Sequence, residues 1–317
     1  MASQSSSQSS ARPSTIAGNA EQRDSPLSAW IRRNNVWSHL VLAVVMFIVL
    51  LPILWLLSAS FKNSEDFYNN PAAFFPTQVS FVNFEYMFTA IQSLPVYMTN
   101  SFILAIGVTV IQVFAASLAG YAFARMNFRG RDLIFLAIVV SMFIPRGGGL
   151  MALYELMNFL KLRNSLFGLI LLFSAALPVP IFIMRQAFLS VPREVEESAM
   201  MDGASRWQIF WQIGIPLVTS AMVIVATLAF VGVWSDYLVT YTMIDRDSQL
   251  TISVGIRKVL TSGYETATAT VPHLRGQFAS EAADAAMLLF SAFPVILIYA
   301  LLQRWFMRGI TEGAIKF

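Results

Sequence analysis

Long apolar stretches separated by short polar segments run through most of the chain. Six of these stretches hold about 20 predominantly apolar residues each, which is the length that an α-helix needs to cross the hydrocarbon core of a bilayer. The pattern therefore predicts an all-α integral membrane protein with six transmembrane helices. The predicted spans are Leu40–Ser60, Ser101–Ala124, Leu133–Tyr154, Leu166–Met184, Pro216–Leu238 and Ala285–Trp305.

The third predicted span has the weakest pattern of the six. Pro145, Arg146 and the Gly147–Gly149 run interrupt its apolar sequence. In a phosphate-binding loop of the Walker type, lysine follows the last glycine, whereas Leu150 follows this run. We interpret the glycines as a helix break and not as a nucleotide site.

The positions of lysine and arginine predict the orientation of the chain. Cytoplasmic loops of membrane proteins are enriched in these residues. Here they gather in the N-terminal tail, in the loops after the second and fourth spans and at the C-terminus, which all lie on one side of a six-span protein. We therefore predict that both termini are cytoplasmic. The residues concerned are Arg12, Arg23, Arg32, Arg33, Arg125, Arg129, Arg131, Arg185, Arg193, Arg206, Arg304, Arg308 and Lys316.

The first part of the chain differs from the rest in composition. Its Ser-rich start cannot bury a core, so residues 1–37 are predicted to be a disordered cytoplasmic tail with a lead-in at the membrane interface. The apolar run that follows is longer than the core of a signal peptide, which indicates an uncleaved first helix. Residues 38–317 are then the transmembrane domain.

Composition excludes several other classes of protein. Hydrophobic residues make up 56% of the chain and charged residues only 12%, about half the charged fraction of a soluble domain. The net charge of +3 comes from basic residues at the ends of apolar runs, so it does not indicate nucleic-acid binding. The absence of cysteine excludes thiolate chemistry and disulfides. His39 and His273 are predicted on opposite sides of the membrane, so no metal site is expected.

The connection between the fourth and fifth predicted spans carries signals of two short helices. Pro192 and the acidic residues after it favour a helix start, and Gly203 can end that helix in a left-handed conformation. Ser205 and Gln208 form a capping-box pattern that begins a second helix. These signals alone leave open whether residues 192–216 have a function or form an ordinary connecting loop with a solvated acidic face.

The same connection resembles the cytoplasmic signature of permease subunits of ATP-binding-cassette (ABC) importers. That signature reads Glu-Ala-Ala, three residues, Gly, nine residues, Ile, one residue, Leu-Pro. The chain has Glu197-Ser198-Ala199, Gly203 and Ile213-Gly214-Ile215-Pro216 at the same spacings. Serine replaces alanine at position 198, and isoleucine replaces leucine at position 215.

This resemblance implies the type I permease fold of ABC importers and a role for residues 192–216, which we name the coupling segment. It implies a coupling helix that docks in a cleft of an ATPase subunit, with Glu197 paired to a basic residue there. The residues to which we assign this coupling role are Glu197, Ser198, Ala199, Asp202, Gly203, Ile213 and Pro216.

Further segments resemble the carbohydrate branch of these permeases, the MalG-like proteins. They include Ala119–Met126, Gln303–Ala314 and Trp234-Ser235-Asp236, in which serine replaces the asparagine of a Trp-Asn-Asp motif. The resemblance covers residues 38–317 and implies import of a sugar or oligosaccharide across the inner membrane of a bacterium. It implies a second permease chain, two ATPase subunits that bind ATP and Mg²⁺, and an extracytoplasmic solute-binding protein. This chain would bind no cofactor and carry no catalytic residue.

Two other functions fit the apolar pattern less well. A stand-alone secondary transporter would need paired buried carboxylates for ion coupling, and Asp236 is the only carboxylate well inside a predicted span. A membrane-embedded enzyme would need a His/Asp or Ser/Lys constellation, which the predicted spans lack. Hydroxyl-bonding and aromatic side chains suit a sugar path, although each could instead join helices or anchor the chain at the interface. The candidates are Gln112, Ser141, Ser174, Trp234, Asp236 and Tyr237.

Overall fold

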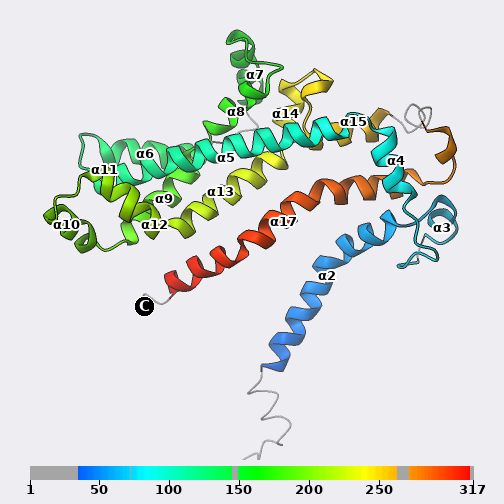
Figure 1. Cartoon of the computed structure of the whole chain (residues 1–317), viewed down its shortest axis with the longest axis horizontal. Coiled ribbons are helices and arrows are strands. Elements are labelled where there is room, and N and C mark those ends of the chain that lie inside the picture. The colour runs from blue at the N-terminus through cyan, green and yellow to red at the C-terminus, as the bar shows by residue number, and fades with distance from the viewer. Residues whose placement is uncertain (1–34, 72, 145–148, 263–270, 315–317) are drawn as a thin grey trace, which may run out of the picture. The chain divides into compact units, whose positions relative to one another are not determined.

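The computed structural model describes residues 35–71, 73–144, 149–262 and 271–314, and these ranges contain helices but no strand (Figure 1). The first predicted span corresponds to α2, and the region after it holds two short helices before the long helix α5. The helices up to this point are α2 (Val36–Ser60), α3 (Ser64–Asn69), α4 (Val82–Ala90) and α5 (Leu94–Arg125).

Shorter helices follow α5, and one long helix, α17, closes the described part of the chain. They are α6 (Arg131–Ser141), α7 (Leu150–Phe159), α8 (Leu166–Ser174), α9 (Pro178–Ser190), α10 (Arg193–Met201), α11 (Arg206–Gln208), the π-helix η2 (Ile209–Gly214), α12 (Ile215–Leu217), α13 (Thr219–Trp234), α14 (Leu238–Met243), α15 (Ile252–Ser262) and α17 (Ser280–Ala314). Two 3₁₀ turns, η3 (Asp247–Gln249) and η4 (Pro272–Leu274), lie between α14 and α17.

Three described helices are long and apolar enough to cross a bilayer, namely Trp37–Ser60, Leu94–Arg125 and Ser280–Trp305. Two further candidates are bent pairs of helices. The pair α8 and α9 bends by 49°, and Arg206–Leu217 with Thr219–Trp234 bends by 76°. The described residues therefore contain at least three apolar spans, and five if each bent pair is one span.

The structure differs from the prediction at the third apolar stretch. Instead of one helix over Leu133–Tyr154, it has α6 of 11 residues and α7 of 10 residues. Each is too short to cross a bilayer, which needs about 20 residues. Residues 145–148, which include Pro145 and Arg146, lie outside the described residues, so the expected helix break falls between two observed helix ends.

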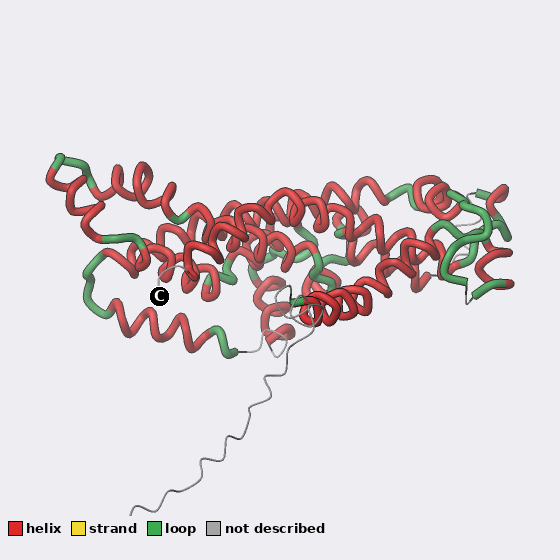
Figure 2. The backbone as a smooth tube through the Cα atoms, turned by 90° about the horizontal axis from the view of Figure 1, so that it is seen from below, coloured by secondary structure: helices red, strands yellow, loops and turns green. Residues whose placement is uncertain are grey.

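The chain divides into two compact units, Met1–Leu54 and Trp55–Phe317. In the first unit, the described residues belong almost entirely to α2, an apolar helix that contains Pro52 near the end of the unit. The second unit holds the other described helices, and Figure 2 shows helix to be the main secondary structure of the described residues, with loop between the helices.

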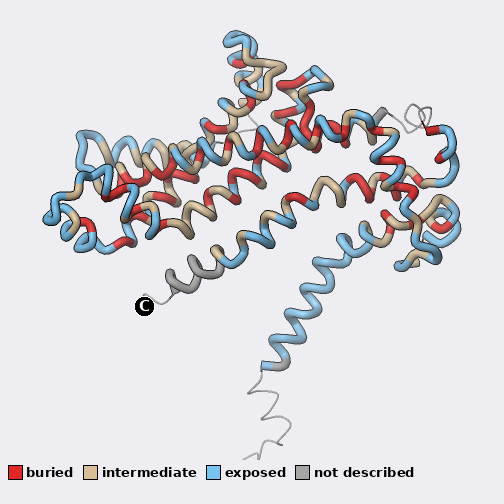
Figure 3. The backbone as a smooth tube through the Cα atoms, in the orientation of Figure 1, coloured by how far each residue is buried: buried red, intermediate tan, exposed pale blue. Residues whose placement is uncertain are grey.

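Helix α5 is the central element of the second unit. It packs against α8, α9 and α13, and α13 packs in turn against α17. Figure 3 shows buried residues along the facing sides of α5 and α13. The closest approach is at Gly120 of α5, where a Cβ atom would lie 2.6 Å from the Cβ of Met184 on α9. Glycine at this position lets the two backbones pack together, as is common between membrane helices.

Two of the three apolar clusters in the described residues of the second unit lie along α5, one toward each of its ends. One cluster includes Leu104 and Trp234 together with residues of the region after α13. The other includes Tyr121, Phe188 and Phe210, and it lies beside the coupling segment. The ends of α5 are therefore each packed against a different part of the chain, with α15 near its start and α10 to α12 near its last turn (Figure 1).

Candidate functional site

The first half of the coupling segment is a short helix that ends in a defined turn. Helix α10 begins after Pro192 and has an acidic first turn with Glu194 and Glu196, which suits the positive end of the helix dipole. Gly203 has a φ of +87°, and the backbone hydrogen bonds from Gly203 N–H to Met200 and from Ala204 N–H to Ala199 form a Schellman turn. The predicted helix end and left-handed glycine are confirmed.

The second half of the coupling segment starts at the predicted capping box. Ser205 Oγ accepts a hydrogen bond from the N–H of Gln208, and the Gln208 side chain accepts one from the N–H of Ser205. The helix that follows is divided into α11, the π-helix η2 and α12, which the sequence pattern did not predict. Pro216 lies in α12, directly before the 76° bend into α13.

Aromatic rings hold the second half of the segment on the transmembrane helices. Phe210 of η2 is buried and lies 5.2 Å from the ring of Tyr121 on α5 and 6.2 Å from that of Phe188 on α9. A Cβ atom on Gly214 would lie 3.3 Å from the Phe188 ring, so glycine keeps the π-helix close to α9. Trp207, which stacks on Phe210, is exposed.

Two neighbouring carboxylates of α10 have different surroundings. Glu196 is buried, and its Oε1 lies 2.8 Å from Nε of Arg125, the last residue of α5. The same guanidinium donates a hydrogen bond to the carbonyl of Val191 at 2.6 Å. Glu197 is exposed and has no ion pair with any described residue. Because successive residues of an α-helix point about 100° apart, Glu197 faces away from the chain while Glu196 faces into it.

The remaining predicted coupling residues surround this exposed carboxylate or follow it. Ser198 is exposed and donates a hydrogen bond to the carbonyl of Glu194. Ala199 is half-buried, and Asp202 is exposed at the C-cap of α10. Ile213 lies half-buried in η2, and Pro216 is exposed. The segment therefore presents α10, the Gly203 turn and Trp207 to its surroundings, and anchors itself through Glu196, Phe210 and Gly214.

Residues 25–312 match a protein family described as binding-protein-dependent transport system inner membrane component. The chain belongs to this family. The permease is 28% identical over 306 residues to the probable ABC transporter permease protein YurM of Bacillus subtilis (strain 168), with 93% of each chain covered. It is 26% identical over 301 residues to the arabinooligosaccharides transport system permease protein AraQ of Halalkalibacterium halodurans, which covers 93% of the permease and 99% of the relative.

A solved structure has the same fold as the permease. It is the crystal structure of a bacterial ABC transporter involved in the import of the acidic polysaccharide alginate, and one of its chains superposes with a TM-score of 0.75 at 22% sequence identity. The match covers 87% of the permease and 97% of that chain. The family match over residues 25–312 confirms the predicted membership of the ABC importer permeases, and this structure shows the shared fold.

Two of the candidate solute-path residues lie together at the bend between α8 and α9. Gln112 of α5 is buried and donates hydrogen bonds to the carbonyls of Phe173 at 2.7 Å and Ala176 at 3.4 Å. Pro180 has no N–H for the Ala176 carbonyl, so the glutamine side chain replaces part of the missing helix hydrogen bonding. Ser174 is also buried here, and its hydroxyl has no hydrogen-bond partner among the described residues.

Three other candidates gather at the end of α13. Trp234 is buried and donates from Nε1 to the carbonyl of Ser291 on α17 at 3.0 Å. Asp236 accepts hydrogen bonds from the N–H and the hydroxyl of Thr240, which places its carboxylate at the start of α14. Tyr237 stacks on Tyr241 with the ring centroids 5.3 Å apart.

Ser141, the sixth candidate, is separate from both groups. Its hydroxyl donates to the Ile138 carbonyl within α6. The six candidate residues, which were chosen by residue type, therefore lie at three separate places in the fold.

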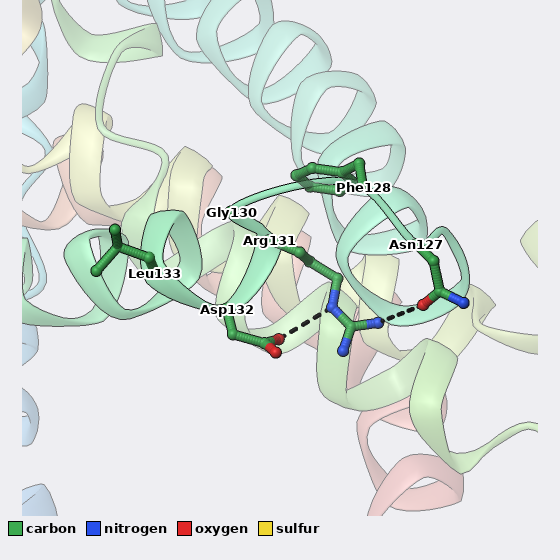
Figure 4. A pocket seen from close by; sticks show the side chains of 6 residues that line it. All are labelled: Asn127, Phe128, Gly130, Arg131, Asp132 and Leu133. Atoms are coloured by element: carbon green, nitrogen blue, oxygen red, sulfur yellow. Dashed lines mark hydrogen bonds and ion pairs between the residues drawn. The ribbon is translucent and has the colours of Figure 1, made fainter.

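A surface pocket lies in the loop between α5 and α6 (Figure 4). Arg131 is among the residues that line it, and its guanidinium is held by Asp132 at 2.9 Å and by Asn127 at 3.0 Å. Gly130 turns the chain there with a φ of +81°. Because the arginine is already paired, we assign a structural role to this pocket and no ligand.

The opposite end of α5 carries a polar network that the sequence analysis missed. Asp247 accepts hydrogen bonds from Tyr97 at 2.7 Å, from Lys258 at 2.6 Å and from Ser93 at 3.2 Å. Partial burial acts to raise the pKa of Asp247, but these hydrogen bonds and the Lys258 charge outweigh it and lower that pKa. Ser93 and Tyr97 lie about 150 positions from Asp247 in the chain, so no local sequence pattern indicates that they contact it.

Replacing Gln112 by leucine is expected to destabilise the permease by about 1–3 kcal/mol, because the part-buried carbonyls of Ala176 and Phe173 lose the donor that the buried glutamine supplies. The shape of the side chain is nearly kept, so the loss reports the hydrogen bonds. Thermal unfolding in detergent would measure it. Val110→Leu is the control, since Val110 is an exposed residue two positions away on the same helix. Equal melting temperatures for Gln112→Leu and the wild type would contradict this role.

Proposed function

We propose that the permease forms the translocation path of an ATP-driven ABC importer for a sugar or oligosaccharide, together with a second permease chain. Two ATPase subunits would supply the energy, and an extracytoplasmic binding protein would deliver the solute. The observation that carries this proposal is the coupling segment. This segment carries the family signature and is fixed to α5 by the pair of Glu196 with Arg125. It exposes the side chain of Glu197 and the turn at Gly203.

The proposed solute class rests on the relatives and on the motifs of the carbohydrate branch. The relative AraQ is named for arabinooligosaccharides, and the similar solved structure belongs to a transporter of the acidic polysaccharide alginate. Side chains that could serve a sugar occur at two places, the α8–α9 bend with Ser174 and the end of α13 with Asp236 and Tyr237. Tyrosine rings suit the apolar face of a sugar, and the carboxylate suits its hydroxyls.

The proposed topology has six crossings with both termini in the cytoplasm, and α6 and α7 together supply the crossing that neither helix can make alone. The basic residues at one end of the second unit support this orientation. Arg125, Arg131, Arg193 and Arg206 all lie at or beside the end of α5 that contacts the coupling segment. Cytoplasmic loops are the basic ones in membrane proteins, and ATPase subunits act from the cytoplasm.

The isolated permease is expected to be inactive, because no segment of its sequence is a nucleotide-binding loop. Proteoliposomes would be prepared with the permease alone and with its partner permease, ATPase subunits and binding protein. ATP-dependent uptake of labelled oligosaccharide should occur only in the complete system. Uptake by the permease alone under an ion gradient would instead identify a secondary transporter and overturn the proposal.

A further inference from the structure

Helix α5 is an unbroken connection between the two ends of the second unit. It has 32 residues, with its proline confined to the first turn, and so extends about 48 Å at 1.5 Å per residue. The neighbouring elements are interrupted, since α8 and α9 bend by 49° and the path from α11 into α13 bends by 76°. Helix α5 has no proline beyond its first turn that would kink it, so a displacement of one end is not taken up at an internal bend.

The last turn of α5 is fixed to the coupling segment. The ion pair between Arg125 and Glu196 is nearly inaccessible, with 6% and 9% of the two side chains exposed. Arg125 also donates a hydrogen bond to the carbonyl of Val191, which lies between the end of α9 and the start of the coupling segment. One turn earlier on α5, Tyr121 packs on Phe210 of η2. The helix end therefore contacts both halves of the coupling segment.

The first turns of α5 are fixed in a comparable way to residues 245–253. Asn100 is buried and donates from Nδ2 to the carbonyls of Ser248 at 3.0 Å and Leu250 at 2.9 Å. Ser101 Oγ accepts a hydrogen bond from the N–H of Ile252 at 2.8 Å. A Cβ atom on Gly255 would overlap the ring of Tyr97, so α15 lies directly against this part of α5.

We propose that α5 transmits movement of the coupling segment to residues 245–253, with Arg125 and Glu196 as the positioning pair at one end and Asn100 at the other. This inference rests on the proposed function, in which the coupling segment follows the ATPase subunits. A buried ion pair with an additional carbonyl contact resists sliding because breaking it leaves a charge without a partner. The segment and the helix end therefore move together, and the other end of α5 carries residues 245–253 with it.

The test measures solute imported per ATP hydrolysed in the reconstituted complex. Glu196→Gln and Arg125→Gln should each retain ATPase subunits on purification and lower this ratio about tenfold, within the range of usual coupling effects. The double variant should lose no more than either single variant, because all three lack the same contact. Arg131→Gln is the matched control, since Arg131 forms an exposed pair with Asp132 at the same end. Wild-type ratios in the two single variants would overturn the proposal.

A second measurement needs neither residue of the ion pair to be changed. The cysteine-free chain permits spin labels at exposed Glu194 on α10 and exposed Ser248. The distance between these labels should stay constant between nucleotide-free and ATP-bound complexes, while that from Glu194 to a label at exposed Phe159 on α7 changes. A Glu194–Ser248 distance that changes with nucleotide would overturn the inference. A wild-type complex without ATP-dependent uptake would contradict the proposed function instead.

Discussion

Glu197→Lys is expected to insert into the membrane normally, to recover much less ATPase subunit on purification and to lose uptake stimulated by the binding protein. The carboxylate is exposed on α10 and forms no ion pair with a described residue, so its reversal leaves the packing of the permease unchanged. At the proposed interface, loss of one partner of a charge pair costs about 2–5 kcal/mol, and the new lysine adds repulsion.

Recovery of ATPase subunit and uptake would be measured on the same preparations. Asp132→Lys makes the same charge change on an exposed residue of the neighbouring helix α6 and should behave as the wild type. An acidic substitution at the facing basic residue of the ATPase should partly restore Glu197→Lys. If Glu197→Lys binds ATPase and transports like the wild type, the coupling segment is only a connector between helices.

Gly120→Ala is expected to destabilise the permease by about 3 kcal/mol, toward the upper end of the cost of overpacking. The added methyl would lie 2.6 Å from the Cβ of Met184 and 2.9 Å from the backbone nitrogen of Arg185. Neither atom can rotate away, so α5 and α9 must separate. Thermal unfolding in detergent and the yield of monodisperse protein would record the effect.

Gly107→Ala on the same helix provides the comparison. A Cβ there would meet the tip of the Ile170 side chain at 3.1 Å, and this flexible end can move. Alanine also favours a helix more than glycine does, by about 1 kcal/mol. The two substitutions are chemically identical, so a similar loss of stability in both would show that the close contact between α5 and α9 is not what limits position 120.

Local signals explain why the coupling segment could be predicted from its sequence. A helix start at Pro192, a left-handed turn at Gly203 and a capping box from Ser205 to Gln208 each depend on residues within four positions of one another. The structure confirms all three. The division of the second helix into α11, η2 and α12 was not predictable in this way, because it follows from packing of Phe210 and Gly214 against α5 and α9.

Contacts between distant parts of the chain account for what the sequence did not reveal. The sequence places Arg125 among the basic residues that predict orientation and in the Ala119–Met126 segment, and Glu196 among the acidic residues after Pro192. It does not indicate their buried pair, which joins positions 71 residues apart. The network of Asp247 and the donation from Gln112 to Ala176 are also long-range. At the third apolar stretch the sequence did indicate an interruption at Pro145 and Gly147–Gly149, but the apolar pattern over Leu133–Tyr154 did not show that the stretch would form two helices as short as α6 and α7.

Glu196 and Glu197 have opposite surroundings, so in the proposed complex attachment of α10 to its own subunit and contact with a partner subunit depend on different side chains. In that complex, Glu196 fixes α10 to its own subunit, and the exposed Glu197 would be the side chain that meets the ATPase subunit. Substitutions at position 197 can therefore alter which ATPase is accepted while the fold is preserved by position 196. Pairs of permease and ATPase with reversed charges could accordingly be engineered to assemble side by side in one cell without exchanging subunits.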